Sequence, residues 1–122
     1  MQLKDHLNNI QDYFSPKVIG EVNDTFIKVA KIKGEDIPWH NHKNEDELFY
    51  IIEGSLLFEE EGKDPFTMSR GDLYIVKRGV NHRVSAEEEC HIMLVEPKAT
   101  AHTGEVVSAV TRSIEEQIGK EC

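Results

Sequence analysis

The chain has 122 residues, a formal net charge of −9, 39% hydrophobic residues and 30% charged residues. This length and balance indicate one globular domain, and they exclude an intrinsically disordered chain and a membrane-spanning one. The acidic balance also excludes a nucleic-acid partner, because binding to a phosphate backbone depends on clustered Lys and Arg.

The first residues lack the basic segment and apolar block of a secretory signal, so we expect a cytoplasmic protein. The two cysteines are Cys90 and Cys122. In that compartment we expect no structural disulfide between them.

Apolar residues near the N-terminus recur at a helical spacing of four, three and four positions. This stripe consists of Leu3, Leu7, Ile10 and Phe14. Ser15 and Pro16 follow it, and proline does not continue a helix. The pattern therefore predicts a short N-terminal helix over residues 3–14 that packs on the domain through one apolar face.

The central part of the chain has the pattern of an antiparallel β-protein. Over residues 26–95, short runs rich in Val, Ile, Phe and Tyr alternate with turn sequences that contain glycine. Six or more such strands with no helix between them predict a sandwich, a jelly roll or a closed barrel, since these architectures protect their edge strands. We expect the barrel to occupy about residues 22–97 of a single domain over residues 1–122.

Residues 98–122 form a C-terminal tail in which the strand pattern fades. Ser113 and Glu116 have the spacing of a capping box, in which each side chain accepts from the other residue's backbone N–H. This spacing predicts a short helix over residues 114–119.

Three histidines and one glutamate are spaced so that an antiparallel β-fold brings them together. His40 and His42 are two residues apart, and in a strand that spacing directs both imidazoles to one face. Glu47 follows a polar stretch typical of a turn, so a hairpin would return its carboxylate to the imidazoles. His82 comes after two further glycine turns, and closure of the barrel would bring it to the same place.

These residue types favour a transition metal. Three neutral imidazoles and one carboxylate suit iron(II), manganese, nickel, copper or zinc, and they suit calcium or magnesium poorly. In an octahedral field, four protein ligands leave two positions open for water, dioxygen or a substrate. The sequence therefore predicts one divalent transition-metal ion held by His40, His42, Glu47 and His82.

The same residues carry a resemblance to the cupin superfamily. Its first motif, G-x5-H-x-H-x4-E-x6-G, fits residues 34–54 at every defined position. Its second motif, G-x5-P-x-G-x2-H-x3-N, fits residues 71–82 at both glycines and the histidine. Lys77 and Ala86 stand where the family has Pro and Asn, and neither position is a ligand in the motif. The resemblance implies an all-β, single-domain cupin, which is a jelly-roll barrel (double-stranded β-helix), here with a short N-terminal helix.

More narrowly, the chain resembles small bacterial cupins of the conserved-barrel type that are often named mannose-6-phosphate isomerase-like. The resemblance rests on residues 39–42, 46–49, 88–91 and 96–97. The habit of this family implies a homodimer. An open strand edge and the N-terminal apolar stripe both need cover, which favours the same conclusion.

Strand parity identifies candidate pocket residues. Phe49 and Ile51 share the parity of Glu47, so we expect them to point into the barrel and make its cavity partly apolar. Tyr74 and Tyr50 are either pocket residues or dimer contacts, and the sequence does not separate these roles.

Two histidines outside the motifs have open roles. His91 sits in a strand, where it either faces the barrel interior as a substrate contact or serves as a structural histidine, the commoner case. His102 lies in a turn-like segment beyond the barrel, where a residue without a functional role is the simpler interpretation.

The open coordination positions favour an enzyme that binds a small organic substrate at the metal, with dioxygen-dependent cleavage and isomerisation as the leading reaction types. No separate general base is identifiable outside the motifs, so the chemistry would rest on the metal. One alternative is a non-catalytic module that holds a metal and a small ligand for binding or sensing, because a fold alone does not decide function. Another is a purely structural dimer.

Overall fold

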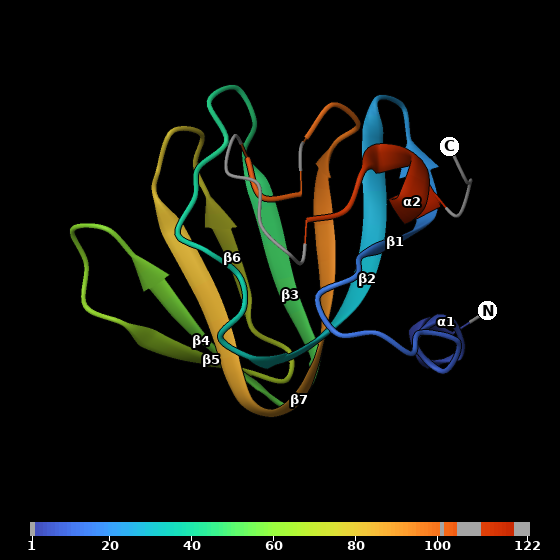
Figure 1. Cartoon of the computed structure of the whole chain (residues 1–122), viewed down its shortest axis with the longest axis horizontal. Coiled ribbons are helices and arrows are strands. Elements are labelled where there is room, and N and C mark those ends of the chain that lie inside the picture. Colours follow the sequence, from blue (N-terminus) through green and yellow to red (C-terminus); the bar gives the residue numbers. More distant parts are fainter. Residues whose placement is uncertain (1, 101, 105–110, 119–122) are drawn as a thin grey trace.

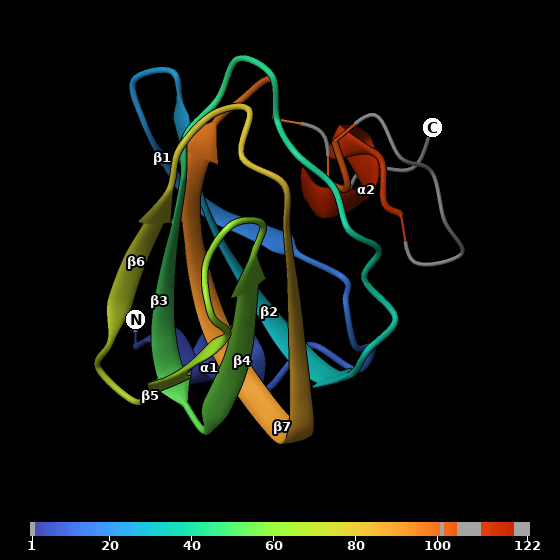
Figure 2. The same cartoon turned by 90° about the vertical axis from the view of Figure 1, so that its left-hand side faces the viewer.

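The computed structural model describes residues 2–100, 102–104 and 111–118, and its strands form two packed antiparallel sheets (Figure 1 and Figure 2). The fold is all-β, as the strand pattern predicted. The elements in chain order are α1 (Leu3–Leu7), β1 (Lys17–Val22), β2 (Thr25–Gly34), β3 (Glu47–Glu53), β4 (Ser55–Glu60), β5 (Phe66–Ser69), β6 (Leu73–Val76), β7 (His82–Pro97) and α2 (Ile114–Ile118).

The long strand β7 belongs to both sheets. Its residues 82–85 pair with β4, which also pairs with β5. Its later residues pair with β2 and β3 in a sheet of order β1-β2-β7-β3-β6. Between these two parts lie the exposed residues 87–89, where Figure 1 shows β7 turning at the lower end of the molecule.

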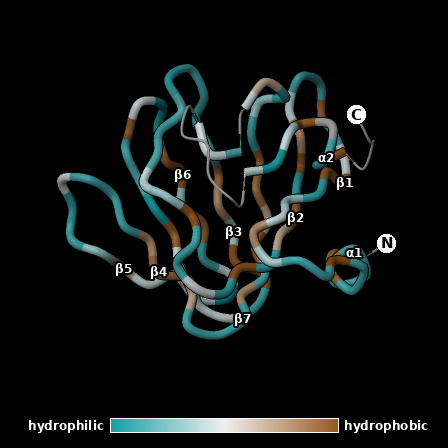
Figure 3. Tube along the Cα trace, viewed as in Figure 1, coloured by the Kyte–Doolittle hydropathy of each residue, from teal (hydrophilic) through white to brown (hydrophobic). Residues whose placement is uncertain are grey.

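The hydrophobic core lies between the two sheets. In β3, Glu47, Phe49 and Ile51 are buried, whereas the residues between them are only half-buried. Phe58 of β4 is fully buried, and its ring stacks on that of His82 at a centroid distance of 5.8 Å. Figure 3 shows hydrophobic residues along the strands and mostly hydrophilic residues in the loops. The stacking contact with Phe58 in the barrel wall helps to fix the position of the His82 ring.

The N-terminal helix is shorter than the predicted span of residues 3–14. α1 ends at Leu7, with Asn8 as its C-cap. Asn8 and the asparagine that follows it favour a helix end, because their side chains compete for backbone hydrogen bonds. The chain then approaches β2, where Phe14 donates its backbone N–H to the Lys31 carbonyl at 2.9 Å. The apolar stripe still packs, since its last two members are buried outside the helix.

The C-terminal capping box forms as the sequence predicted. The Ser113 backbone N–H donates to Glu116 Oε1 at 3.0 Å, and the Glu116 backbone N–H donates to Ser113 Oγ at 3.1 Å. The helix that follows ends at Ile118 within the described part of the chain, and Gly119 lies outside it.

Two further sequence expectations concern cysteine chemistry and membranes. Cys90 is a buried free thiol, and burial raises its pKa to about 11. Cys122, for which the sequence predicted no disulfide with Cys90, lies outside the described residues.

Among the residues that are described, no helix is both long enough and apolar enough to cross a membrane.

Candidate metal centre

The three predicted histidine ligands come from two parts of the chain. His40 and His42 lie in the loop between β2 and β3, and His82 is the first residue of β7. His40 and His82 form a β-bridge in which the backbone N–H of each donates to the carbonyl of the other, at 3.0 and 2.9 Å. The strand that the sequence predicted at His40 and His42 is thus reduced to a single bridge, because Pro38 and the polar residues 43–46 interrupt regular pairing.

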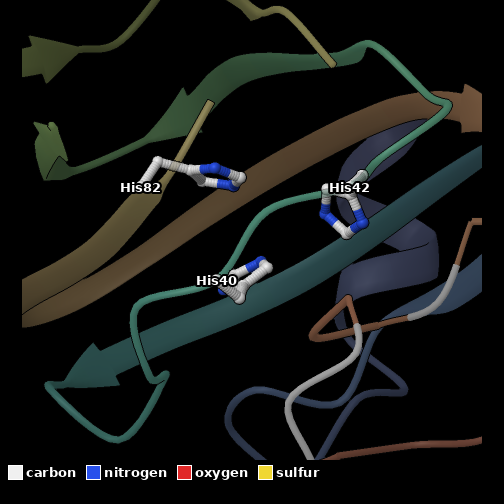
Figure 4. A group of neighbouring side chains, drawn as sticks. All are labelled: His40, His42 and His82. Atoms are coloured by element: carbon white, nitrogen blue, oxygen red, sulfur yellow. The ribbon is translucent and has the colours of Figure 1, made fainter. Parts of the chain in front are cut away.

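The imidazoles of these three residues form one buried cluster. A ring nitrogen from each lies within 4.8 Å of the others. Figure 4 shows the three side chains pointing toward one another, with His40 and His42 on one loop and His82 on another segment. The distances between ring centroids are 4.5 to 5.7 Å.

Glu47, the first residue of β3, lies beside this cluster. Its Oε1 is 3.6 Å from His42 Nε2 and 3.4 Å from His82 Nε2. Its side chain is 5% exposed, so water does not compete for these oxygens. The structure therefore brings together all four residues that the sequence predicted at one site.

Backbone carbonyls orient two of the rings. His40 Nδ1 lies 2.8 Å from the Pro38 carbonyl, and His82 Nδ1 lies 3.0 Å from the Val80 carbonyl. A carbonyl only accepts, so each Nδ1 carries the proton and donates. The Nε2 atom of each neutral ring then has its lone pair free, which is the arrangement that second-shell hydrogen bonds give to metal-binding histidines.

Several polar atoms at the centre are buried without a hydrogen-bond partner. These atoms are both ring nitrogens of His42, Nε2 of His82 and Oε1 of Glu47. Leaving a buried polar atom unpaired costs about 1–3 kcal/mol, so a native site normally offers an explanation for it. A divalent cation among these atoms provides that explanation, and the residues present fit a transition-metal ion.

The electrostatics of the site suit cation binding. Burial lowers the pKa of His40 to about 4, so its ring is neutral at neutral pH. Burial would raise the pKa of Glu47, but the neighbouring Glu96 and imidazole groups hold it well below the usual carboxyl range. Burial would lower the pKa of His82, but the neighbouring Glu47 raises it, so a metal ion at this ring would take the place of a proton. Deprotonated imidazole nitrogens and an ionised carboxylate are the forms that bind a metal.

A buried ion pair lies behind Glu47. Lys28 Nζ is 2.6 Å from Glu96 Oε1 and donates to Gln117 Oε1 of α2 at 2.5 Å. Burial and the charge of Glu47 raise the pKa of Glu96 well above the usual carboxyl range. This network connects the C-terminal helix to the candidate metal centre.

Sequence reasoning missed this network, although strand parity contained a signal. Lys28 has the same strand parity as Phe26 and Ala30, so it lies on the buried face of β2. A buried lysine requires a buried partner. Glu96 has the same parity as Ile92 and Leu94 on the buried face of β7. Two opposite charges on inward faces of adjacent strands predict a buried pair.

A cavity opens beside the histidine cluster. Its polar lining consists of His40, Glu47 and His102. The other lining residues are apolar and come from β2, β3, β7 and the loops beside them. They are Phe14, Pro16, Ala30, Ile32, Ile37, Phe49, Val84, Ile92 and Leu94.

The predicted pocket residues occupy different environments. Phe49 lines the cavity, whereas Ile51 is buried in the core on the same face of β3. Tyr74 donates its hydroxyl to Glu60 Oε1 at 2.7 Å. His91 alternates with the buried residues of β7, and its Nε2 is 2.6 Å from Glu89 Oε2 at the surface. His102, which the sequence placed beyond the barrel, lines the cavity instead.

A wider groove of about 710 Å³ lies at the bend of β7. Its walls include Glu35, Glu87 and Glu88, and it contains none of the clustered histidines. Exposed acidic side chains of this kind are commonly solvated without binding a cation. We therefore place the candidate functional site at the histidine cluster.

Comparisons with known proteins agree with this geometry. Residues 29–96 match the family model described as Cupin_2, cupin domain, and this range contains the three clustered histidines and Glu47. The chain is 31% identical over 91 residues to the uncharacterized protein YdbB of Bacillus subtilis (strain 168), which covers 75% of this chain and 80% of YdbB.

A second relative and one solved structure extend the comparison. The chain is 29% identical over 83 residues to an acireductone dioxygenase of Tuber melanosporum (strain Mel28), covering 64% of this chain but only 43% of that enzyme. The crystal structure of a cupin-2 domain containing protein from Shewanella frigidimarina superimposes with a TM-score of 0.76 at 36% identity. That match covers 80% of this chain and 93% of the other.

Proposed function

Because the chain belongs to the Cupin_2 family of cupin domains, we propose that it holds one divalent transition-metal ion and acts on a small organic molecule in the adjoining cavity. The proposed ligands are His40, His42, Glu47 and His82, and the proposed ion is iron, manganese, nickel, copper or zinc. The observation that carries this proposal is the set of unpartnered, buried ring nitrogens and carboxylate oxygen that face one another.

Within this proposal we favour an enzyme of the dioxygenase or isomerase type. When bound, such an ion supplies Lewis acidity and, for a redox-active metal, electron-transfer chemistry. The chain itself holds the His40 and His82 imidazoles in the required tautomer, keeps Glu47 ionised and surrounds the site with apolar side chains that limit access of water. Similarity to part of an acireductone dioxygenase supports the dioxygenase type.

An isomerase acting on a phosphorylated sugar has less support. A phosphate group is normally held by Arg, Lys or backbone N–H groups. The described lining of the cavity contains neither Arg nor Lys, and the nearby Lys28 is already paired with Glu96. The second candidate function is a non-catalytic module that binds a metal and a small ligand.

Elemental analysis of untagged protein tests the metal proposal. We expect about one transition-metal ion per chain, and we expect His40→Ala to abolish it because a ligand is lost. His6→Ala is the matched control, since His6 lies on α1 outside the cluster. Equal metal content in the wild type and His40→Ala would remove this site from the proposal.

Cobalt(II) substitution tests whether the centre is open. A five- or six-coordinate centre should show weak visible absorption that changes when azide or a bidentate organic acid is added. Intense tetrahedral bands that no added ligand perturbs would indicate a closed structural site. That result would contradict the enzyme proposal and leave the fold assignment unaffected.

A further inference from the structure

His102 is a polar residue of the cavity that lies outside the family match over residues 29–96. It follows β7 in the C-terminal segment, yet it lines the same cavity as His40 and Glu47. The C-terminal segment therefore supplies one polar wall of a site whose other polar groups come from the barrel.

The hydrogen bonding of His102 differs from that of the clustered histidines. Its Nδ1 accepts the backbone N–H of Arg112 at 2.9 Å. A backbone N–H only donates, so Nδ1 is unprotonated and a neutral ring carries its proton on Nε2. His40 and His82 have the opposite arrangement, with Nδ1 facing a carbonyl.

This tautomer separates His102 from the metal ligands. A neutral imidazole that binds a metal through Nε2 must keep its proton on Nδ1. The Arg112 backbone N–H occupies that Nδ1 as a donor, so the ring offers a donor N–H at Nε2 in place of a lone pair. Among the described residues, the ring nitrogens that lie close enough together to share one ion belong to His40, His42 and His82, and His102 lies outside this group.

The surroundings keep this ring neutral. Burial lowers its pKa to about 4, and the positive charges of Lys28 and Arg112 act in the same direction. Glu47 opposes them but does not compensate. Across the neutral range the ring therefore keeps Nδ1 as an acceptor for Arg112 and Nε2 as a donor.

We propose that His102 is a ligand-contacting residue, which donates a hydrogen bond from Nε2 to an oxygen of a small molecule bound at the metal group. This inference rests on the function proposed above. The remaining lining is apolar, with Ile32, Ile92 and Leu94 among its members. The cavity of about 40 Å³ and its apolar lining favour a small carboxylate or carbonyl compound, and the absence of Arg and Lys from the described lining disfavours a sugar phosphate.

Two amide substitutions separate the ligand contact from the structural role of the ring. In His102→Asn the side-chain oxygen can occupy the place of Nδ1 and accept from Arg112, but nothing replaces the donor at Nε2. In His102→Gln the side-chain amide reaches the place of Nε2 and keeps a donor. Both proteins should retain about one metal ion per chain, because His102 is not a ligand.

The test is a titration of the cobalt(II)-loaded proteins with 2-oxobutanoate, followed in the visible spectrum. A hydrogen bond to a charged acceptor corresponds to about a 10- to 100-fold change in affinity. We expect His102→Asn to bind at least about tenfold more weakly than the wild type, and His102→Gln to remain within about threefold. Mannose 6-phosphate should perturb the wild-type spectrum less than 2-oxobutanoate at equal concentration.

The outcomes distinguish this inference from the proposed function. Equal affinity in the wild type and both variants, or weaker binding in His102→Gln than in His102→Asn, would overturn the contact at Nε2. Loss of metal in His102→Asn would show that the residue is a ligand and overturn the proposal as well. A metal-loaded wild type that responds to no probe would contradict the open site itself, and with it both proposals.

Discussion

The barrel and the C-terminal segment each present histidine to the same cavity, but in opposite hydrogen-bonding states. In the barrel, carbonyl groups of Pro38 and Val80 fix the proton of His40 and His82 on Nδ1. In the C-terminal segment, a backbone N–H fixes the proton of His102 on Nε2. The comparison teaches that the backbone group behind the ring, rather than the residue type, decides whether a histidine offers a lone pair or a proton.

The most direct test of this difference in role is to remove one histidine from each region. His82→Ala should reduce the metal content from about one ion per chain to none, because the ring that stacks on Phe58 supplies a ligand. His102→Asn should leave the metal content unchanged. Elemental analysis checks both, and metal retained in His82→Ala would contradict the division of roles.

The ion pair that connects the two regions should have the next largest effect. Lys28→Met removes the buried donor that Glu96 and Gln117 share and leaves both acceptors buried without it, so we expect the free energy of unfolding to fall by about 1–3 kcal/mol. Urea denaturation of the metal-free protein measures this change.

Lys77→Met provides the matched control for that substitution. It removes an exposed pair with Asp46, for which we expect a much smaller loss than for Lys28→Met. Similar losses in Lys28→Met and Lys77→Met would show that the buried pair does not hold the C-terminal helix to the barrel.

The pH dependence of the free energy of unfolding should also report on the His102 ring. The pKa of His102 is lowered to about 4 in the folded chain. Below about 6.5 the unfolded chain takes up a proton that the folded chain rejects, so this residue lowers stability as the pH falls through that window. Between pH 7 and pH 4.5 the metal-free wild type should lose about 2 kcal/mol more than His102→Asn. Parallel stability curves would show that the ring is solvated.

The smallest effect on the site should come from the outer face of the barrel. Leu73 and Ile75 of the edge strand β6 are 56% and 46% exposed. We expect a homodimer that covers apolar surface of this kind, and Leu73→Lys with Ile75→Lys should shift light scattering toward the monomer mass without changing the metal content. A wild-type protein that is monomeric at micromolar concentration would refute the dimer.

The sequence predicted the residues of the barrel part of the site because their spacing reflects local geometry. Glu47 begins a strand directly after a polar loop, and strand parity correctly placed Phe49 and Ile51 on its buried face. The predicted end of the N-terminal helix was wrong, because Phe14 pairs with Lys31 of β2 and does not continue the helix.

The rest of the site depended on contacts that no local pattern contains. His102 reaches the cavity only because the chain beyond β7 returns over the barrel, and its tautomer depends on a bond to Arg112, ten residues later. Lys28 and Gln117 are 89 residues apart, so only the folded structure shows that they meet. Strand parity could have indicated that Lys28 points inward, but it could not have identified Gln117 as a partner.

The placement of β7 in both sheets has a consequence for how the protein opens. This strand pairs with β2, β3 and β4, so neither sheet can separate from the other without breaking it. Local fluctuations therefore do not free its backbone amides, which should exchange hydrogen with solvent only when the whole domain unfolds. Since His82 and Glu96 lie near its two ends, the candidate metal centre is attached to the slowest-exchanging segment of the chain.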